Sequence, residues 1–161
     1  MNSRARLPSR HVRFRTKSAA ETKDSAALLA KDLAAVSFHD HALVIALSGD
    51  LGGGKTTFVQ GFAKGLGVRD AVTSPTFLIA RNYSVKRGGF KRLIHVDAYR
   101  LERAEEIKIL GWADWLKDRH AIILVEWAKN IEKLLPKIHF DIHFEFISDT
   151  ERKITINVED I

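Results

Sequence analysis

The sequence predicts an α/β fold with a mostly parallel sheet, helices on both faces of that sheet, and an antiparallel hairpin at the C-terminal end. Three observations support this fold class. Apolar runs without polar alternation occur at 43–47 and 121–125, which is typical of strands buried on both faces of a parallel sheet. Helical patterns separate the apolar runs, as in strands that pair in parallel. From 138 to 146 apolar and polar residues alternate, which predicts a strand exposed on one face.

The composition indicates one folded domain that follows a basic extension. The chain has 161 residues, of which 45% are hydrophobic, and it has no cysteine, so disulfides and thiol chemistry are excluded. The first 17 residues include six Arg or Lys and no acid, and the net charge of the whole chain is +6, so the remainder is neutral. We expect residues 1–17 to be a disordered extension and residues 18–161 to form a single domain. An electrostatic arm for RNA and a transit peptide are the other interpretations of the extension.

The sequence gives no sign of a membrane partner. No run approaches the roughly 18 apolar residues that a membrane-spanning helix needs. The absence of cysteine fits the reducing cytoplasm, where we expect the protein to act.

The expected elements follow one another along the chain. Ser18 and Glu21 have the spacing of a capping box before an alanine-rich stretch, which predicts a helix over about 20–36. The apolar run ending at Gly49 predicts a strand, and the stretch from 55 to 66 has helical periodicity. Two extended stretches joined by a turn at 86–89 come next. A helical stretch over about 104–118 then leads into the second buried strand.

The segment between the first buried strand and its helix fits the phosphate-binding pattern G-x-x-x-x-G-K-[ST] at every fixed position. Glycines allow backbone N–H groups to approach phosphate oxygens, and the following helix directs its positive N-terminus at the same anion. We expect Lys55 to reach the β- and γ-phosphates and to take part in catalysis, and the Thr56 hydroxyl to bind Mg²⁺. The pattern predicts a P-loop NTPase-like fold and an ATP site. The expected ATP contacts here are Gly49, Asp50, Leu51, Gly52, Gly53, Gly54, Lys55, Thr56 and Thr57.

Two carboxylates follow apolar strands and are the candidate catalytic acids. Asp97 comes after LIHV and Glu126 after IILV. Ligands of open α/β sheets bind beyond the carboxyl ends of the strands, so both side chains are expected to face the phosphates. There they would hold Mg²⁺ and orient water. The spacing of the two residues in the sequence does not show which carboxylate has which role. The segment Ser74-Pro75-Thr76 is either a switch that senses the γ-phosphate or an ordinary turn.

Five short stretches in this order resemble the TsaE family, formerly called YjeE. They are GDLGGGKTTF, SPTF, HVDAYRL, EE with a following LG, and VEW. The resemblance covers roughly residues 18–158 and implies a small bacterial P-loop ATPase that uses ATP and Mg²⁺. It further implies a role in forming threonylcarbamoyladenosine at position 37 of ANN-decoding tRNAs. The expected partners are TsaD, which transfers the threonylcarbamoyl group, and TsaB, and tRNA is reached only through their complex.

The resemblance also implies roles for individual residues. Thr56 and Glu126 would bind Mg²⁺, with Asp97 as a second acidic group that orients the metal or the attacking water. Trp127 belongs to the E-W signature and is a candidate switch or partner residue.

Two segments outside the phosphate loop are expected near the nucleotide on the same basis. The stretch from Ser18 to Thr22 resembles a family segment that lies by the nucleotide, and Arg152 resembles a C-terminal family arginine. Ser18, Thr22 and Arg152 are therefore expected ATP contacts.

Two further functions remain open from the sequence. A small-molecule or nucleoside kinase would need an arginine-bearing lid and an acceptor pocket, and neither is evident between Asp97 and Glu126. A nucleotide-gated binding module would bind ATP with negligible hydrolysis and contact RNA through the basic extension. Guanine specificity has no support, because the sequence contains no N-K-x-D motif.

Overall fold

The computed structural model describes residues 10–36 and 40–158. In these residues the chain forms a seven-stranded sheet with the order β1-β7-β6-β2-β5-β4-β3. The four central strands are parallel: β6 (Phe140–Phe146), β2 (Leu43–Gly49), β5 (Ala121–Glu126) and β4 (Arg92–Asp97). Antiparallel strands extend the sheet on both sides: β3 (Ala80–Ser84) next to β4, and β7 (Arg152–Val158) followed by β1 (Arg10–Thr16) next to β6. The predicted α/β fold is confirmed, and the C-terminal hairpin is part of the sheet because β6 also pairs with β2.

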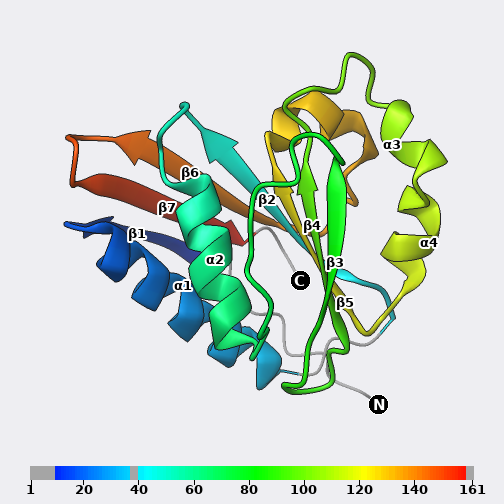
Figure 1. Cartoon of the computed structure of the whole chain (residues 1–161), viewed down its shortest axis with the longest axis horizontal. Coiled ribbons are helices and arrows are strands. Elements are labelled where there is room, and N and C mark those ends of the chain that lie inside the picture. Colours follow the sequence, from blue (N-terminus) through cyan, green and yellow to red (C-terminus); the bar gives the residue numbers. More distant parts are fainter. Residues whose placement is uncertain (1–9, 37–39, 159–161) are drawn as a thin grey trace.

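Helices cover both faces of the sheet (Figure 1). The helices α1 (Ala19–Ala34) and α2 (Lys55–Gly65) lie on one face. The short helices α3 (Glu106–Ile109) and α4 (Trp112–Lys117) and the 3₁₀ segment η1 (Ala128–Leu134) lie on the other face. Successive residues of β2 alternate between the two cores: Ile45 packs beneath α1 and α2, and Val44 and Ala46 pack on the opposite side. This arrangement explains why the strand sequence is apolar at every position.

The helix α1 begins at the predicted capping box. The Ser18 hydroxyl accepts a hydrogen bond from the Glu21 backbone N–H at 3.1 Å, and the Lys17 backbone N–H donates to the Glu21 carboxylate at 2.6 Å. The first contact satisfies one of the N–H groups that a helix start leaves without partners, and the second ties the residue before the cap to the first turn. The single helix expected over 104–118 is instead two helices, because Gly111 adopts a left-handed φ of 104° between them.

The strand β1 corrects the expectation that residues 1–17 are disordered. Residues 10–16 pair along their full length with β7, so the expectation is wrong for this part, and residues 1–9 lie outside the described residues. Phe14 packs against the core beneath α1, and the buried Thr16 hydroxyl lies 2.8 Å from the Thr22 hydroxyl. Without β1, the outer edge of β7 would leave backbone N–H and C=O groups without partners, and the β1 backbone supplies those partners. The alternation of Val12, Phe14 and Thr16 with basic residues is typical of such a strand.

A polar contact joins the N-terminal end of β4 to the loop before β5. Arg92 donates a hydrogen bond to the Asp118 carboxylate at 2.6 Å, and the His120 backbone N–H donates to it at 2.9 Å. Burial raises the pKa of Asp118, but the His120 N–H and Arg92 outweigh burial and hold that pKa below its ordinary 3.8.

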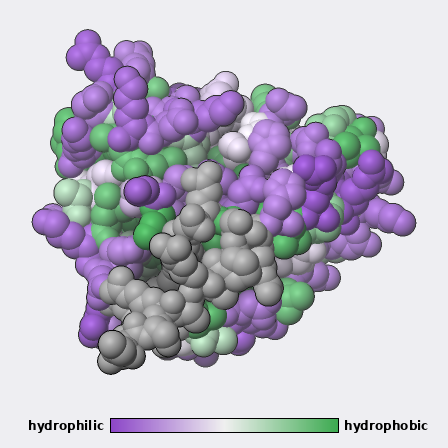
Figure 2. All heavy atoms as spheres, turned by 180° about the vertical axis from the view of Figure 1, so that it is seen from behind, coloured by the Kyte–Doolittle hydropathy of each residue, from purple (hydrophilic) through white to green (hydrophobic). Residues whose placement is uncertain are grey.

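One face of the molecule is largely polar. Seen from behind, hydrophilic residues surround smaller hydrophobic areas (Figure 2). In the described part of the chain, no helix combines the length and the apolar character that crossing a bilayer requires.

Candidate nucleotide site

A cavity of about 380 Å³ lies at the carboxyl ends of β2, β4 and β5. The parallel register places Asp97 of β4 directly opposite Glu126 of β5. The helix α2 begins at this cavity, so the strand, loop and helix meet as the sequence predicts. The cavity is lined by Leu51, Gly52, Gly53, Gly54, Lys55, Thr56, Thr57, Ser74, Thr76, Asp97, Tyr99, Glu126, Trp127 and Arg152.

The phosphate loop depends on glycine at two positions for different reasons. Gly49 has a φ of 128°, and a Cβ added there would lie 2.1 Å from the Phe144 carbonyl oxygen of β6. Gly54 is the N-cap of α2 with a left-handed φ of 95°, which turns the chain into the helix. The loop is further closed by the Gly53 N–H, which donates to the Asp50 carbonyl at 3.0 Å. Gly49 and Asp50 therefore shape the loop without lining the cavity.

Lys55 lies folded along the loop. Its side-chain ammonium donates to the carbonyls of Gly49 at 2.9 Å and Asp50 at 2.7 Å. Burial lowers the pKa of Lys55, and the charges of Glu126, Asp50 and Asp97 oppose that shift. A positive charge held at the start of α2, next to the helix N-terminus, favours an anionic ligand.

Thr56 and Glu126 meet, as the sequence predicts. The Thr56 hydroxyl is 3.1 Å from both carboxylate oxygens of Glu126, to which it donates. The carboxylate of Glu126 is buried, at 3% exposed, although it carries a charge that burial penalises.

His95 is a further partner of Glu126, and sequence reasoning assigned it no role. Its Nε2 lies 2.8 Å from a Glu126 carboxylate oxygen, and the ring nitrogen donates because a carboxylate only accepts. The imidazole is fully buried, and its Nδ1 has no hydrogen-bond partner within the described residues. A polar residue inside the apolar strand LIHV was the signal that could have identified it.

Asp97 is bonded to the segment at 74–76. One carboxylate oxygen accepts hydrogen bonds from the hydroxyls of Ser74 at 3.0 Å and Thr76 at 2.8 Å, and the other accepts from the Tyr99 backbone N–H at 3.0 Å. Pro75 between them is buried and lies outside the cavity lining, and its carbonyl closes a turn by accepting two backbone N–H groups. The segment is therefore a turn whose two hydroxyls contact a candidate catalytic acid.

Trp127 and Arg152 complete the walls of the cavity. Trp127 has a left-handed φ of 56°, which is uncommon for a non-glycine residue, and its ring centroid lies 4.3 Å from the Lys55 ammonium and 4.9 Å from the Tyr99 ring centroid. Arg152, in the first position of β7, donates to the Gly52 carbonyl at 3.0 Å. The C-terminal arginine is thus at the loop.

Besides Gly49 and Asp50, two predicted contacts outside the phosphate loop are not brought to the cavity. Ser18 is engaged as the cap of α1, and Thr22 is 2% exposed and bonded to Thr16. Neither residue lines the cavity. Their contacts fix the start of α1 against β1.

The donor set at the cavity fits a nucleotide with a hard metal ion. Thr56, Glu126 and Asp97 offer oxygen atoms, which are the ligands that Mg²⁺ prefers together with phosphate oxygens. The loop N–H groups, the N-terminus of α2 and Lys55 offer positive charge for phosphates.

Comparisons with known proteins agree with this geometry. The family model described as threonylcarbamoyl adenosine biosynthesis protein TsaE matches residues 16–154. The tRNA threonylcarbamoyladenosine biosynthesis protein TsaE of Bacillus subtilis (strain 168) is 40% identical over 146 residues, which cover 91% of this chain and 85% of that protein. The protein of the same name from Mycobacterium tuberculosis (strain ATCC 25618 / H37Rv) is 35% identical over 115 residues, or 69% and 68% of the two chains. The crystal structure of Bacillus subtilis YdiB is similar with a TM-score of 0.69 at 34% identity, over 94% of this chain and 88% of that one. The resemblance read from the sequence is confirmed, and the chain belongs to the TsaE family.

Proposed function

We propose that this protein binds ATP with Mg²⁺ and hydrolyses it as a subunit needed to form threonylcarbamoyladenosine at position 37 of ANN-decoding tRNAs. In this proposal it works in the cytoplasm on a complex of TsaD and TsaB and does not transfer the threonylcarbamoyl group itself. Membership of the TsaE family supports the pathway. The observation that carries the ATP step is the contact of Thr56 with the buried Glu126 beside a complete phosphate loop.

The residues around the nucleotide cavity have distinct roles in the proposed reaction. The loop N–H groups and Lys55 bind the phosphates, and Arg152 supports the loop through Gly52. Thr56 and Glu126 would hold a magnesium ion, which would supply positive charge against the phosphates. Asp97 orients the attacking water or the ion.

Slow turnover without partners follows from the contacts of Asp97. Both of its carboxylate oxygens are occupied by hydrogen bonds, two of which come from the hydroxyls of Ser74 and Thr76. A partner that moves the segment at 74–76 would free an oxygen of Asp97 for water. We therefore propose that TsaD and TsaB stimulate hydrolysis.

The test measures phosphate release from ATP and Mg²⁺ with and without a TsaD–TsaB complex. Release that requires the complex supports the proposal; transfer to a small acceptor would indicate a kinase, and binding without turnover a binding module. Lys55→Ala should weaken ATP binding and abolish release, and Glu126→Gln should keep much of the ATP binding but lose release. Lys117→Ala, at an exposed lysine of α4 on the opposite face, is the matched control and should behave as the wild type.

A further inference from the structure

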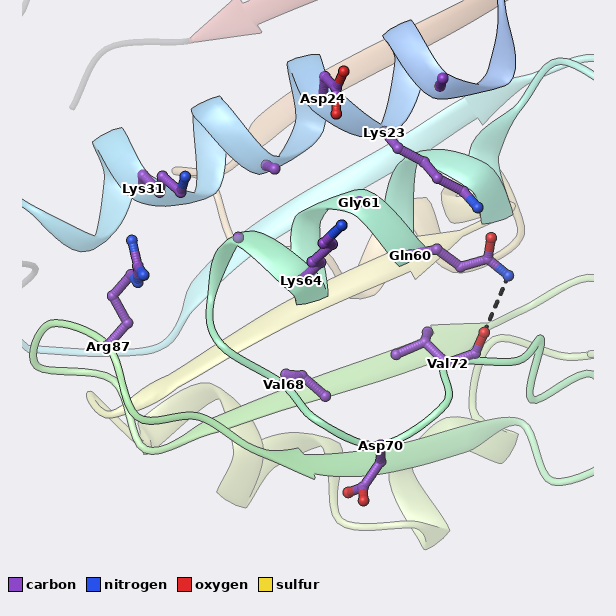
Figure 3. A pocket seen from close by; sticks show the side chains of 13 residues that line it. Lys23, Asp24, Lys31, Gln60, Gly61, Lys64, Val68, Asp70, Val72 and Arg87 are labelled. Carbon is purple, nitrogen blue, oxygen red and sulfur yellow. Dashed lines mark hydrogen bonds between the residues drawn. The ribbon is translucent and has the colours of Figure 1, made fainter.

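A second cavity, separate from the nucleotide cavity, lies beside α1 and α2. It is a groove of about 840 Å³ between α1, α2 and the segment that follows α2, and it shares no lining residue with the nucleotide cavity (Figure 3). Four cationic side chains line it: Lys23 and Lys31 of α1, Lys64 of α2, and Arg87 of the turn between β3 and β4.

On the inner side of this groove, positive charges outnumber negative charges. Arg87 extends toward α1 near Lys31, and Lys64 extends from α2 toward α1, whereas the carboxylates of Asp24 and Asp70 point away from α2 (Figure 3). Within residues 10–36 and 40–158, the side chains of Lys23, Lys31, Lys64 and Arg87 form no ion pair or hydrogen bond. Unpaired cations that face one another repel, so an anion between them would be stabilised.

Close backbone contacts build this groove into the fold. A Cβ added to Gly61 of α2 would lie 2.2 Å from the Lys23 carbonyl oxygen, so α2 packs directly on the backbone of α1. A Cβ added to Gly88 would lie 2.3 Å from the Ala34 carbonyl oxygen, which holds the turn that carries Arg87 at the C-terminal end of α1. The backbones that carry the cations are therefore fixed relative to one another.

The spacing and composition of the groove favour a phosphate backbone. Lys23 and Lys31 are eight residues apart on α1, or about 12 Å along its axis at about 1.5 Å per residue, so the cations are spread along the groove, as the charges of a phosphate backbone are. Among the lining residues only Val68 and Val72 are apolar and larger than alanine, and none is aromatic. Protein partners are usually anchored by aromatic and large aliphatic side chains, which this groove does not offer.

We propose that this groove binds the phosphate backbone of structured RNA without reading its bases. Lys23, Lys31, Lys64 and Arg87 contact successive phosphates and release counterions on binding. The choice of RNA over DNA rests on the proposed role in tRNA modification, whereas the recognition of phosphates rests on the groove alone. A direct RNA contact of this kind differs from the expectation that tRNA is reached only through the complex of TsaD and TsaB.

The experiment measures binding of the full chain to a fluorescent tRNA transcript by anisotropy, over a series of salt concentrations. The triple variant Lys31→Gln/Lys64→Gln/Arg87→Gln should bind at least about tenfold more weakly near 0.1 M salt. Its plot of log affinity against log salt should be shallower by about 2, because each lost phosphate contact removes about 0.7–0.9 from the slope. The variant Lys31→Arg/Lys64→Arg keeps the charges and should bind within about twofold of the wild type.

The matched control carries the same loss of charge on the opposite face of the sheet. It is Lys108→Gln/Lys117→Gln/Lys133→Gln, at exposed positions of α3, α4 and η1, and it should keep the wild-type affinity and slope. Residues 1–17 are the same in both triple variants, so any contribution of these basic residues cancels. Equal binding by the two triple variants would overturn the proposal.

Two further measurements distinguish RNA from an acidic protein as the occupant, and the groove from the nucleotide cavity. Poly-glutamate that binds more tightly than the tRNA transcript, and that the groove variant loses, would identify an acidic protein as the occupant and also overturn the proposal. ATP binding on the same samples should be unchanged in both triple variants, because the two cavities share no lining residue. A chain that binds RNA through the groove but not ATP would refute the proposed function and leave this inference standing.

Discussion

Replacing His95 by alanine is expected to lower the free energy of unfolding by about 3–5 kcal/mol and to slow ATP hydrolysis more than it weakens ATP binding. The hydrogen bond of His95 to the Glu126 carboxylate is 2.8 Å long between fully buried partners. A hydrogen bond to a charged group contributes about 1.5–3 kcal/mol, and removing it leaves a buried carboxylate short of a donor. The cavity left by the imidazole adds about 2 kcal/mol.

The variant His95→Gln separates the contribution of the hydrogen bond to stability from that of packing. The Gln amide nitrogen reaches nearly as far as the histidine Nε2 and can donate to Glu126, so His95→Gln should lose only about 1–2 kcal/mol. Urea unfolding followed by circular dichroism measures the stability of each variant. His41→Gln, at an exposed histidine before β2, is the control and should change stability by less than about 0.5 kcal/mol.

Kinetics in the presence of TsaD and TsaB test whether His95 positions Glu126. The kcat for phosphate release should fall at least about tenfold in His95→Ala and recover in His95→Gln, while the KM for ATP stays within about twofold. The KM is preserved because His95 contacts Glu126 and not the phosphate loop. A His95→Ala protein with the wild-type kcat, or with a loss of stability below about 1 kcal/mol, would refute the reasoning.

Three other changes have outcomes that the structure determines. Gly49→Ala should cost about 3 kcal/mol or more in urea unfolding, because the new Cβ would lie 2.1 Å from a β6 carbonyl, whereas Gly52→Ala, with positive φ but nothing within 4 Å, should cost about 1 kcal/mol; equal costs would show that the close approach is unimportant. Asp118→Asn should lower stability near neutral pH. The folded-state pKa of Asp118 lies below 3.8, so the stability that its ionised form contributes is complete above pH 3.8 and is lost as the pH falls through the folded-state pKa. The urea midpoints of the variant and the wild type should therefore converge in acid. A difference between the midpoints that stays constant with pH would contradict the role given to the Asp118 carboxylate. Deleting residues 1–17 should lower the free energy of unfolding by about 3 kcal/mol, since β7 loses its partner strand and Phe14 its burial; a stable, monomeric chain that starts at residue 18 would show that β1 is dispensable.

The phosphate loop and its two acids could be predicted because their signals are local. Glycines, Lys55 and Thr56 follow one another in the sequence, and Asp97 and Glu126 each end an apolar run. Parallel pairing then brings the ends of these runs to one edge of the sheet, a consequence of topology that the sequence pattern already implies.

Other features depend on long-range pairing and were not predicted. The strand β1 has the alternation of a strand, but its basic residues made the segment resemble a solvated tail until the free edge of β7 was known. The contact of His95 with Glu126 requires the register of β4 against β5. The left-handed backbone of Trp127, which directs its ring toward Lys55, has no counterpart in the residue types around it.

The contact of Arg152 with Gly52 spans 100 residues. Because Arg152 is synthesised so much later than the phosphate loop, the nucleotide cavity is completed late in translation. The phosphate loop leaves the ribosome first, but its support from β6 and Arg152 is synthesised about 5–20 s later at about 5–20 residues per second. Throughout that interval β2 lacks its neighbour on the β6 side, and the carbonyl of Phe144 that packs against Gly49 does not yet exist. A nascent or prematurely ended chain that stops before β6 therefore carries the entire phosphate-binding sequence without the contacts of β6 and Arg152 that support the loop.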